Sequence, residues 1–196
     1  MAITGTVRHD LAGLEARLRL YPQELLAADV RAKNRTASST RTEAVRRLRP
    51  LLRGLKAGAI RRQIKLKRAS RAAPRAVLEF SAKRFRLFGN YNARQTKSGV
   101  RITGLPWRME ALDGDLIPVQ ALAHAFIQRA RATGVPNVWL RVGTKRYPIT
   151  AIVASSLATA FRNADLGAAL VTFSRARHRA VLGQEMRYRL SRRKAT

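Results

Sequence analysis

The sequence contains no cysteine, and it has few acidic, histidine and aromatic residues for a chain of 196 residues. The absence of cysteine excludes a disulfide framework, a thiolate metal site and a cysteine nucleophile. Eleven Asp and Glu and three His leave little material for acid–base catalysis or for metal binding. No apolar run is long enough for a signal peptide or a transmembrane helix, so we expect synthesis in the host cytoplasm and no membrane partner.

Positive charge is what the sequence has in excess. Forty Lys and Arg face the eleven acids, which gives a formal net charge of +29. Repulsion of this size destabilises an isolated chain unless negative groups offset it. The arginine guanidinium forms bidentate hydrogen bonds with both phosphates and carboxylates, so either nucleic acid or acidic protein surfaces could supply the negative groups. Because 46% of the residues are hydrophobic, the chain can also build a core.

The N-terminal part of the sequence has helical periodicity. Apolar spacing predicts a short helix from about Val7 to Leu20, and a second, strongly basic helix that begins at Pro22 and continues to Ser70. Pro50 and nearby glycines predict that this second helix breaks between Arg49 and Gly58.

The pattern changes to apolar–polar alternation after Pro74, which predicts strands. Three strands are expected between His124 and Ile152, with turns at Thr133-Gly134 and Gly143-Thr144, whereas the stretch from Gly89 to Gly99 has a loop composition. One face of these strands is apolar and the other carries arginines. From Ser155 or Ser156, either of which could be the N-cap, the chain is helical again.

These elements predict an α+β fold with a central antiparallel sheet flanked by long basic N-terminal helices and a C-terminal helix. We divide the chain into a basic helical region (1–73), an antiparallel sheet core (74–153) and a C-terminal basic helix that packs on the core (154–196). The three regions are expected to form one folded unit.

The basic helices are candidate binding elements, because a solvated helix face usually alternates acids and bases and these helices do not. Two partners remain open, which are nucleic-acid phosphates and acidic protein neighbours. The candidate contacts are Arg46, Arg47, Arg49, Arg53, Arg61, Arg62, Lys65, Lys67, Arg68, Arg187, Arg189, Arg192 and Arg193.

Aromatic side chains accompany arginines in the predicted sheet, a combination typical of interface anchors. Phe126 and Trp139 could equally pack against each other across adjacent strands. The candidate interface anchors are Phe126, Trp139, Arg141, Arg146 and Tyr147.

No catalytic constellation is visible. Asp113 and Asp115 flank a glycine at a predicted hairpin tip, and His9, His124 and His178 are isolated from one another and from ligand patterns. The sequence lacks a nucleophile elbow and a phosphate-binding loop. We therefore expect no enzyme activity, no catalytic or metal-binding residues and no cofactor. This also argues against a nuclease-like toxin.

Several segments, in their order along the chain, resemble a known family. These are "ADVRAKNRTASSTRTEAVRRL" from Ala28, "AIRRQIKLKRAS", "AFIQRA", "VWLRVGTKRYPITAI" and the closing "LATAFRNAD" and "EMRYRLSRR". The chain from about Ala28 to Arg193 is similar to the minor tail protein Z family of tailed bacteriophages and prophages, also called tail-completion proteins. The most specific parts are Ala125 to Gln128 and the run R-x-G-x-x-R-Y-P-I that begins at Arg141.

The resemblance implies a structural virion protein at the head-proximal end of the tail, in the neck region, where it helps to join tail to head. Related tail-completion and neck proteins assemble as rings, often hexameric, around the DNA channel. The implied partners are copies of the chain itself, neighbouring tail-terminator, tail-tube or head-completion proteins, and the end of the genome DNA. The alternative is a sequence-independent, basic nucleic-acid-binding protein of ribosomal or nucleoid type.

Overall fold

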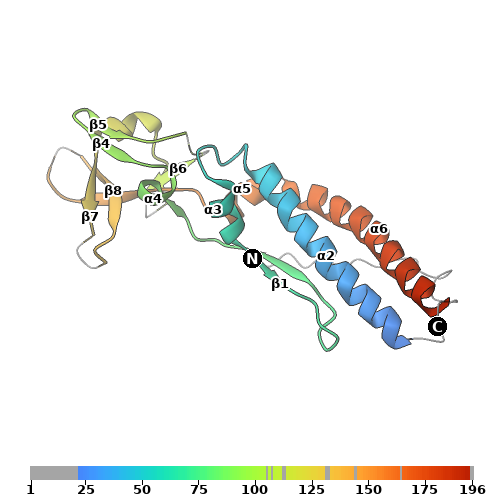
Figure 1. The fold of residues 1–196 in the computed structure, drawn as a ribbon. Coiled ribbons are helices and arrows are strands. Elements are labelled where there is room, and N and C mark those ends of the chain that lie inside the picture. Colours follow the sequence, from blue (N-terminus) through green and yellow to red (C-terminus); the bar gives the residue numbers. More distant parts are fainter. Residues whose placement is uncertain are drawn as a thin grey trace. The chain divides into compact units, whose positions relative to one another are not determined.

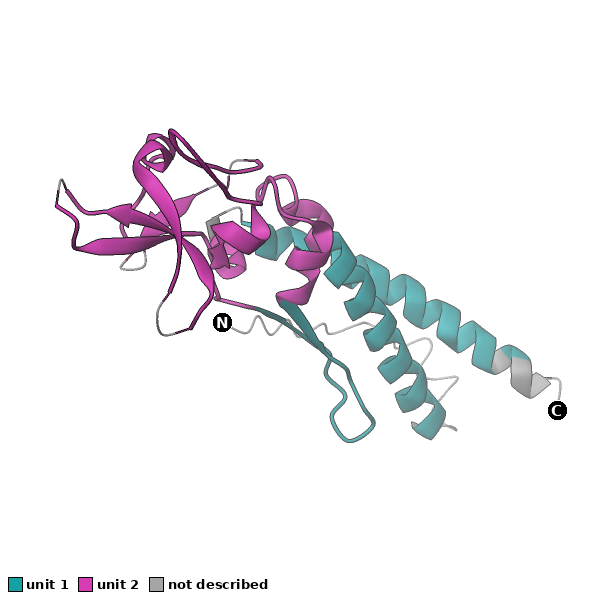
Figure 2. Ribbon diagram, turned by 60° about the vertical axis from the view of Figure 1, so that its left-hand side comes forward, with its two compact units in different colours: residues 1–44, 64–80, 165–196 teal, residues 45–63, 81–164 magenta. Residues whose placement is uncertain are grey.

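The computed structural model describes residues 22–104, 106, 108–111, 114–130, 133–143, 145–163 and 165–194. The chain divides into two compact units, each assembled from separate stretches of sequence (Figure 2). Unit 1 contains residues 1–44, 64–80 and 165–196, and unit 2 contains residues 45–63 and 81–164. The helix predicted from Val7 to Leu20 lies outside the described residues. The division of the sequence into three regions stays a prediction.

Two long helices dominate unit 1, and they run antiparallel to each other (Figure 1). Helix α2 spans Pro22–Leu48, and α6 spans Leu166–Lys194. Small alanines on α2 allow a close approach to larger apolar side chains on α6. Their buried cluster consists of Ala28, Ala32, Val181, Leu182 and Met186, with Leu25 packed against it. The predicted helix start at Pro22 is confirmed.

The basic segment after α2 is not one continuous helix. Helix α2 ends at Leu48, and a short helix α3 follows at Ala57–Arg62, so the predicted break between Arg49 and Gly58 is confirmed. The prediction of helix through to Ser70 is wrong.

Strand β1, Ile64–Lys67, pairs antiparallel with β2, Val77–Phe80, in unit 1. Residues 64–67 form a strand rather than a helix because Ile64 and Leu66 alternate with two lysines, and a period of two residues is that of a strand. This alternation is only four residues long and follows a stretch with helical spacing, so the strand was not predicted.

The core of unit 2 is an antiparallel sheet with the strand order β3-β9-β8-β7. The strands are β3 (Phe85–Arg86), β7 (Ala125–Arg129), β8 (Pro136–Arg141) and β9 (Ile149–Ala154), and β6 (Met109–Ala111) also pairs with β9. The last four residues of β9 are all buried, so this strand is the centre of the unit. The three predicted strands and both turns are confirmed, and Gly134 and Gly143 in those turns have positive φ angles.

A second hairpin covers the free edge of β7. It consists of β4 (Arg94–Thr96) and β5 (Gly99–Arg101), so the loop predicted from Gly89 to Gly99 is wrong in part. The Ile127 backbone N–H donates a hydrogen bond of 2.8 Å to the Gln95 side-chain oxygen, which satisfies one edge donor. A Cβ atom at Gly99 would lie 2.3 Å from the Leu122 carbonyl oxygen, so the hairpin needs glycine there.

Short helices complete unit 2. They are α4 (Leu87–Asn90), the 3-10 helix η1 (Val119–His124) and α5 (Leu157–Asn163). The Ser156 hydroxyl accepts a hydrogen bond from the Thr159 backbone N–H at 3.1 Å, which confirms Ser156 as an N-cap. The single closing helix that we expected is interrupted at Asp165, whose φ is 45°. The predicted α+β class is confirmed.

Candidate interaction surfaces

The first candidate surface is one face of the β7–β8 pair in unit 2. Phe126 is directly opposite Trp139 in the strand register, so the predicted cross-strand pair is confirmed. The Arg141 guanidinium carbon lies 5.2 Å from the centre of the Phe126 ring, a cation–π distance. The Trp139 indole N–H donates to the Gln128 carbonyl oxygen at 3.0 Å. These contacts hold three of the five candidate anchors together in a fixed orientation.

The other two candidate anchors lie in the turn between β8 and β9. The Arg146 guanidinium carbon is 5.7 Å from the centre of the Tyr147 ring, whose residue is 60% exposed. Val142 is 54% exposed, and its backbone N–H donates to the Pro148 carbonyl oxygen at 3.0 Å, which closes the turn. Exposed aromatic and aliphatic groups beside arginines have the composition of an interface centre rather than that of a solvated turn.

The predicted separation of arginines from apolar side chains holds in β8 but not in β7, where the exposed Arg129 lies on the same face as Val138. Arg141 is exposed on the face that carries Trp139, whereas Val138 on the opposite face is fully buried. Strand β8 therefore presents charge on one face and core on the other, whereas β9 is buried on both faces.

The candidate basic contacts do not lie on one helix. Those from Arg46 to Arg62 belong to unit 2, on the end of α2, on α3 and on the turns between them. Lys65, Lys67 and Arg68 belong to the β1–β2 hairpin of unit 1, and Lys67 forms an ion pair with Glu79. Arg187 and Arg189 lie on α6, and the side chains of Arg192 and Arg193 are outside the described residues. The basic candidates thus divide between both units.

Most acidic side chains of the described residues serve the fold. Between the antiparallel helices α2 and α6, Asp29 lies 2.6 Å from the Lys33 ammonium and 3.5 Å from His178 Nε2. Arg35 of α2 pairs with Glu185 of α6 at 2.7 Å. Burial acts to raise the pKa of Asp29, but the polar contacts of its carboxylate with His178 and Lys33 outweigh this effect and leave that pKa below its ordinary value. The half-buried Asp29 and the buried His178 thus join α2 to α6.

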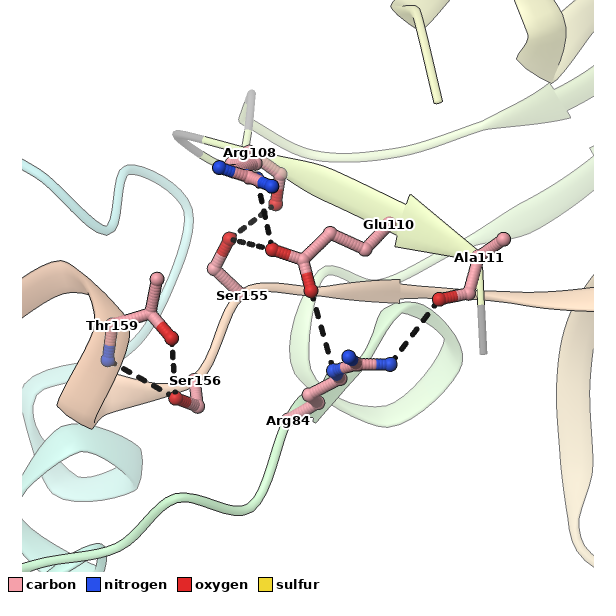
Figure 3. Close-up of polar contacts among 7 residues, drawn as sticks. All are labelled: Arg84, Arg108, Glu110, Ala111, Ser155, Ser156 and Thr159. Carbon is pink, nitrogen blue, oxygen red and sulfur yellow. Dashed lines mark hydrogen bonds and ion pairs between the residues drawn. The ribbon is translucent and has the colours of Figure 1, made fainter. Parts of the chain in front are cut away.

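A second buried carboxylate, which the sequence did not single out, joins β6 to β9 in unit 2 (Figure 3). Glu110 lies 2.9 Å from Arg108 Nε and 3.2 Å from Arg84 Nε. The Ser155 hydroxyl oxygen is 3.3 Å from the Glu110 carboxylate and 3.1 Å from the Arg108 carbonyl oxygen. Arg84 also donates to the Ala111 carbonyl oxygen at 3.2 Å. We call these four residues, Arg84, Arg108, Glu110 and Ser155, the Glu110 cluster.

The only sequence signal for this cluster is an acid between two apolar residues, Met109 and Ala111, in a very basic chain. Its two arginines and its serine come from separate segments, which only the folded sheet brings together.

The described residues offer no metal site, because no three of their His, Asp and Glu side chains gather into a ligand group. His124 is exposed at the end of η1, and His178 is buried on α6. His9 and Asp113 are outside the described residues. Among the helices described, none combines the length and the apolar character needed to cross a bilayer.

The sequence model of the family described as "Prophage minor tail protein Z (GPZ)" matches residues 18–194. The chain belongs to the prophage minor tail protein Z family. No curated protein and no solved structure matches the chain.

This minor tail protein is therefore a structural component of a phage virion, and its partners are other virion proteins. Membership of this family confirms the resemblance that the sequence showed. A structural tail subunit works through its surfaces, which argues against catalysis.

Proposed function

We propose that this minor tail protein acts at the head-proximal end of the tail, in the neck region. There it would form a ring, expected to be hexameric, around the DNA channel and help to join tail to head. Its neighbours would be copies of itself and tail-terminator, tail-tube or head-completion proteins. Family membership supports the tail role, and the Arg146–Tyr147 turn, in which Tyr147 is 60% exposed, supports a subunit interface.

The proposed mechanism gives the sheet and the charge separate tasks. The antiparallel sheet of unit 2 is a rigid platform on which Phe126 and Trp139 hold Arg141 in place. Tyr147 and Val142 insert into the adjoining subunit, where burial of their apolar surface drives association. Exposed arginines around them select acidic neighbours and exclude basic ones.

Two experiments test this proposal. Electron microscopy of virions labelled with an antibody against this chain should show label where the tail meets the head. Label along the tail tube or at the distal tip would contradict the proposed position.

Ring formation is tested by mass photometry of the purified chain, alone and with its neck partners. Tyr147→Ala should shift the population toward monomers, because it removes the exposed anchor of the turn. Leu116→Ala is the matched control, because Leu116 is similarly exposed at 63% and lies outside that turn. Equal effects of both substitutions would contradict the assigned interface.

The alternative, a general nucleic-acid-binding protein of ribosomal or nucleoid type, requires only the charge. It does not account for the family match over residues 18–194. Recovery of the chain with host ribosomes or nucleoid, and its absence from virions, would favour that alternative.

A further inference from the structure

The loop that joins β1 to β2 in unit 1 carries three basic residues and no acidic residue. It covers residues 68–76, with the sequence "RASRAAPRA", and we call it the basic loop. Arg68, Arg71 and Arg75 are all exposed, and none of the three pairs with a carboxylate within the described part of the chain. No acidic residue occurs in the sequence between Glu43 and Glu79. The loop therefore concentrates positive charge without local neutralisation.

The basic loop is held in one conformation by helix α2 of the same unit. The Asn34 side-chain amide donates to the Ala69 carbonyl oxygen at 2.9 Å and accepts from the Ala69 N–H at 2.8 Å. The Lys33 ammonium donates to the Pro74 carbonyl oxygen at 2.9 Å. Both contacts join α2 to loop backbone, so they position the loop without using its arginines.

Internal hydrogen bonds order the loop further. The Ser70 N–H donates to the Ala73 carbonyl oxygen at 3.0 Å, and the Ala73 N–H donates to the Ser70 hydroxyl oxygen at 3.0 Å. A loop fixed at both ends and across its middle loses little conformational entropy when it binds. Charged loops that only keep a protein soluble do not need this degree of order.

The side chains of the basic loop distinguish its two possible partners. Protein interfaces obtain their affinity from large apolar or aromatic anchors surrounded by polar groups. Between its arginines, the basic loop offers only alanine, serine and proline, whereas the β8–β9 turn offers Tyr147 and Val142. A nucleic-acid backbone needs no apolar anchor, because arginine N–H groups bind its phosphates directly.

We propose that the basic loop binds the phosphate backbone of duplex DNA without sequence preference, through Arg68, Arg71 and Arg75. The position of the subunit beside the DNA channel, as proposed above, determines where such binding would take place in the virion. The binding itself is a property of the chain, so it can fail while the tail position stands, and the reverse also holds.

The test measures binding of the full chain to a short random-sequence DNA duplex by fluorescence anisotropy over a range of salt concentrations. A labelled polyglutamate peptide serves as the acidic-protein probe in parallel. The loop variant carries R68Q, R71Q and R75Q.

The control variant carries R94Q, K97Q and R101Q in the β4–β5 hairpin, where the three basic residues are also exposed. Both variants lose the same charge from a hairpin. Far-UV circular dichroism checks that each remains folded.

For the loop variant, the slope of log Kobs against log salt should become shallower by about 0.9 for each phosphate that the loop no longer neutralises, hence by about 2.7 for three phosphates. The control variant should keep a slope close to that of the unchanged chain. Asn34→Ala retains every charge but releases the loop from α2, so it should weaken duplex binding at a fixed salt concentration. A purely electrostatic, unstructured attraction would not respond to that substitution.

Three results would overturn the proposal. The first is an equal loss of slope in the loop and control variants, which would mean that affinity follows net charge alone. The second is an unchanged chain that shows no salt-sensitive duplex binding. The third is a loop variant that loses binding to polyglutamate and keeps binding to the duplex, which would assign the basic loop to an acidic protein partner.

Discussion

Replacement of Glu110 by glutamine should destabilise unit 2 more than any other single loss of a carboxylate among the residues described. The glutamine side chain would keep the shape of the original and one acceptor for the Ser155 hydroxyl, but it would remove the negative charge that both arginines face. The Glu110 side chain is only 9% exposed, so water cannot replace it at the centre of the cluster.

The magnitude follows from how far the two arginines can reach water. Breaking a fully buried ion pair by removing one partner costs about 3–5 kcal/mol. The Arg84 and Arg108 side chains are 35% and 37% exposed, so their charges can be partly solvated after the substitution. We therefore expect a loss of about 2 kcal/mol in the free energy of unfolding for Glu110→Gln.

Urea unfolding followed by tryptophan fluorescence measures this loss, because both tryptophans, Trp107 and Trp139, are in the sequence of unit 2. Glu79→Gln is the control, and its unfolding is followed by far-UV circular dichroism because unit 1 contains no tryptophan. It removes the same charge from the more exposed Lys67–Glu79 pair of unit 1 and should cost less than about 1 kcal/mol.

A double-mutant cycle with Arg84→Gln tests whether the cluster acts as a unit. The cost of Glu110→Gln should fall by about 1 kcal/mol when Arg84 has already been replaced. If Glu110→Gln costs no more than Glu79→Gln, or if the cycle shows additive effects, the Glu110 carboxylate does not stabilise the junction of β6 and β9, and the reasoning is refuted.

Three further predictions follow from the same structure. Asp29 has a lowered pKa in the folded chain, so its contribution to stability is present above its unfolded pKa and is lost as the pH falls through the lower folded value; thermal unfolding by circular dichroism in mildly to strongly acidic buffers should show this loss, and Asp29→Asn should flatten it. Gly54→Ala should destabilise unit 2 by about 2 kcal/mol or more, because Gly54 has a φ of 90° and its Cβ would lie 2.4 Å from the Thr103 carbonyl oxygen. Gly58→Ala in α3 is the opposite case, since nothing lies within 4 Å of its Cβ, and it should stabilise by about 0.5–1 kcal/mol; the same sign for both glycines in urea unfolding would contradict this reasoning. Ser156→Ala should cost about 1 kcal/mol by removing the α5 N-cap, whereas Ser38→Ala, on an exposed position of α2, should have almost no effect on the unfolding midpoint.

Local signals in the sequence were sufficient for the elements whose pattern is long and bounded by turn residues. Strands β7, β8 and β9 follow from apolar–polar alternation, and Gly134 and Gly143 mark their turns because positive φ angles favour glycine. The start of α2 at Pro22 and the cap at Ser156 follow from single residues with a specific preference. The family resemblance also rested on local runs, chiefly those in β7 to β9.

The sequence by itself thus determined the α+β class, the basic character, the family and the residues that carry charge and aromatic rings. Only the tertiary structure decided that Ile64–Lys67 is a strand, because its partner β2 begins ten residues later and pairing, rather than propensity, stabilises a four-residue strand. It also decided which side chains meet. Glu110 pairs with Arg84 and lies within hydrogen-bond distance of Ser155, and Asn34 binds the backbone of the basic loop. These contacts join residues that are far apart in the sequence. Composition and periodicity report on each segment separately, so they contain no information about such pairs.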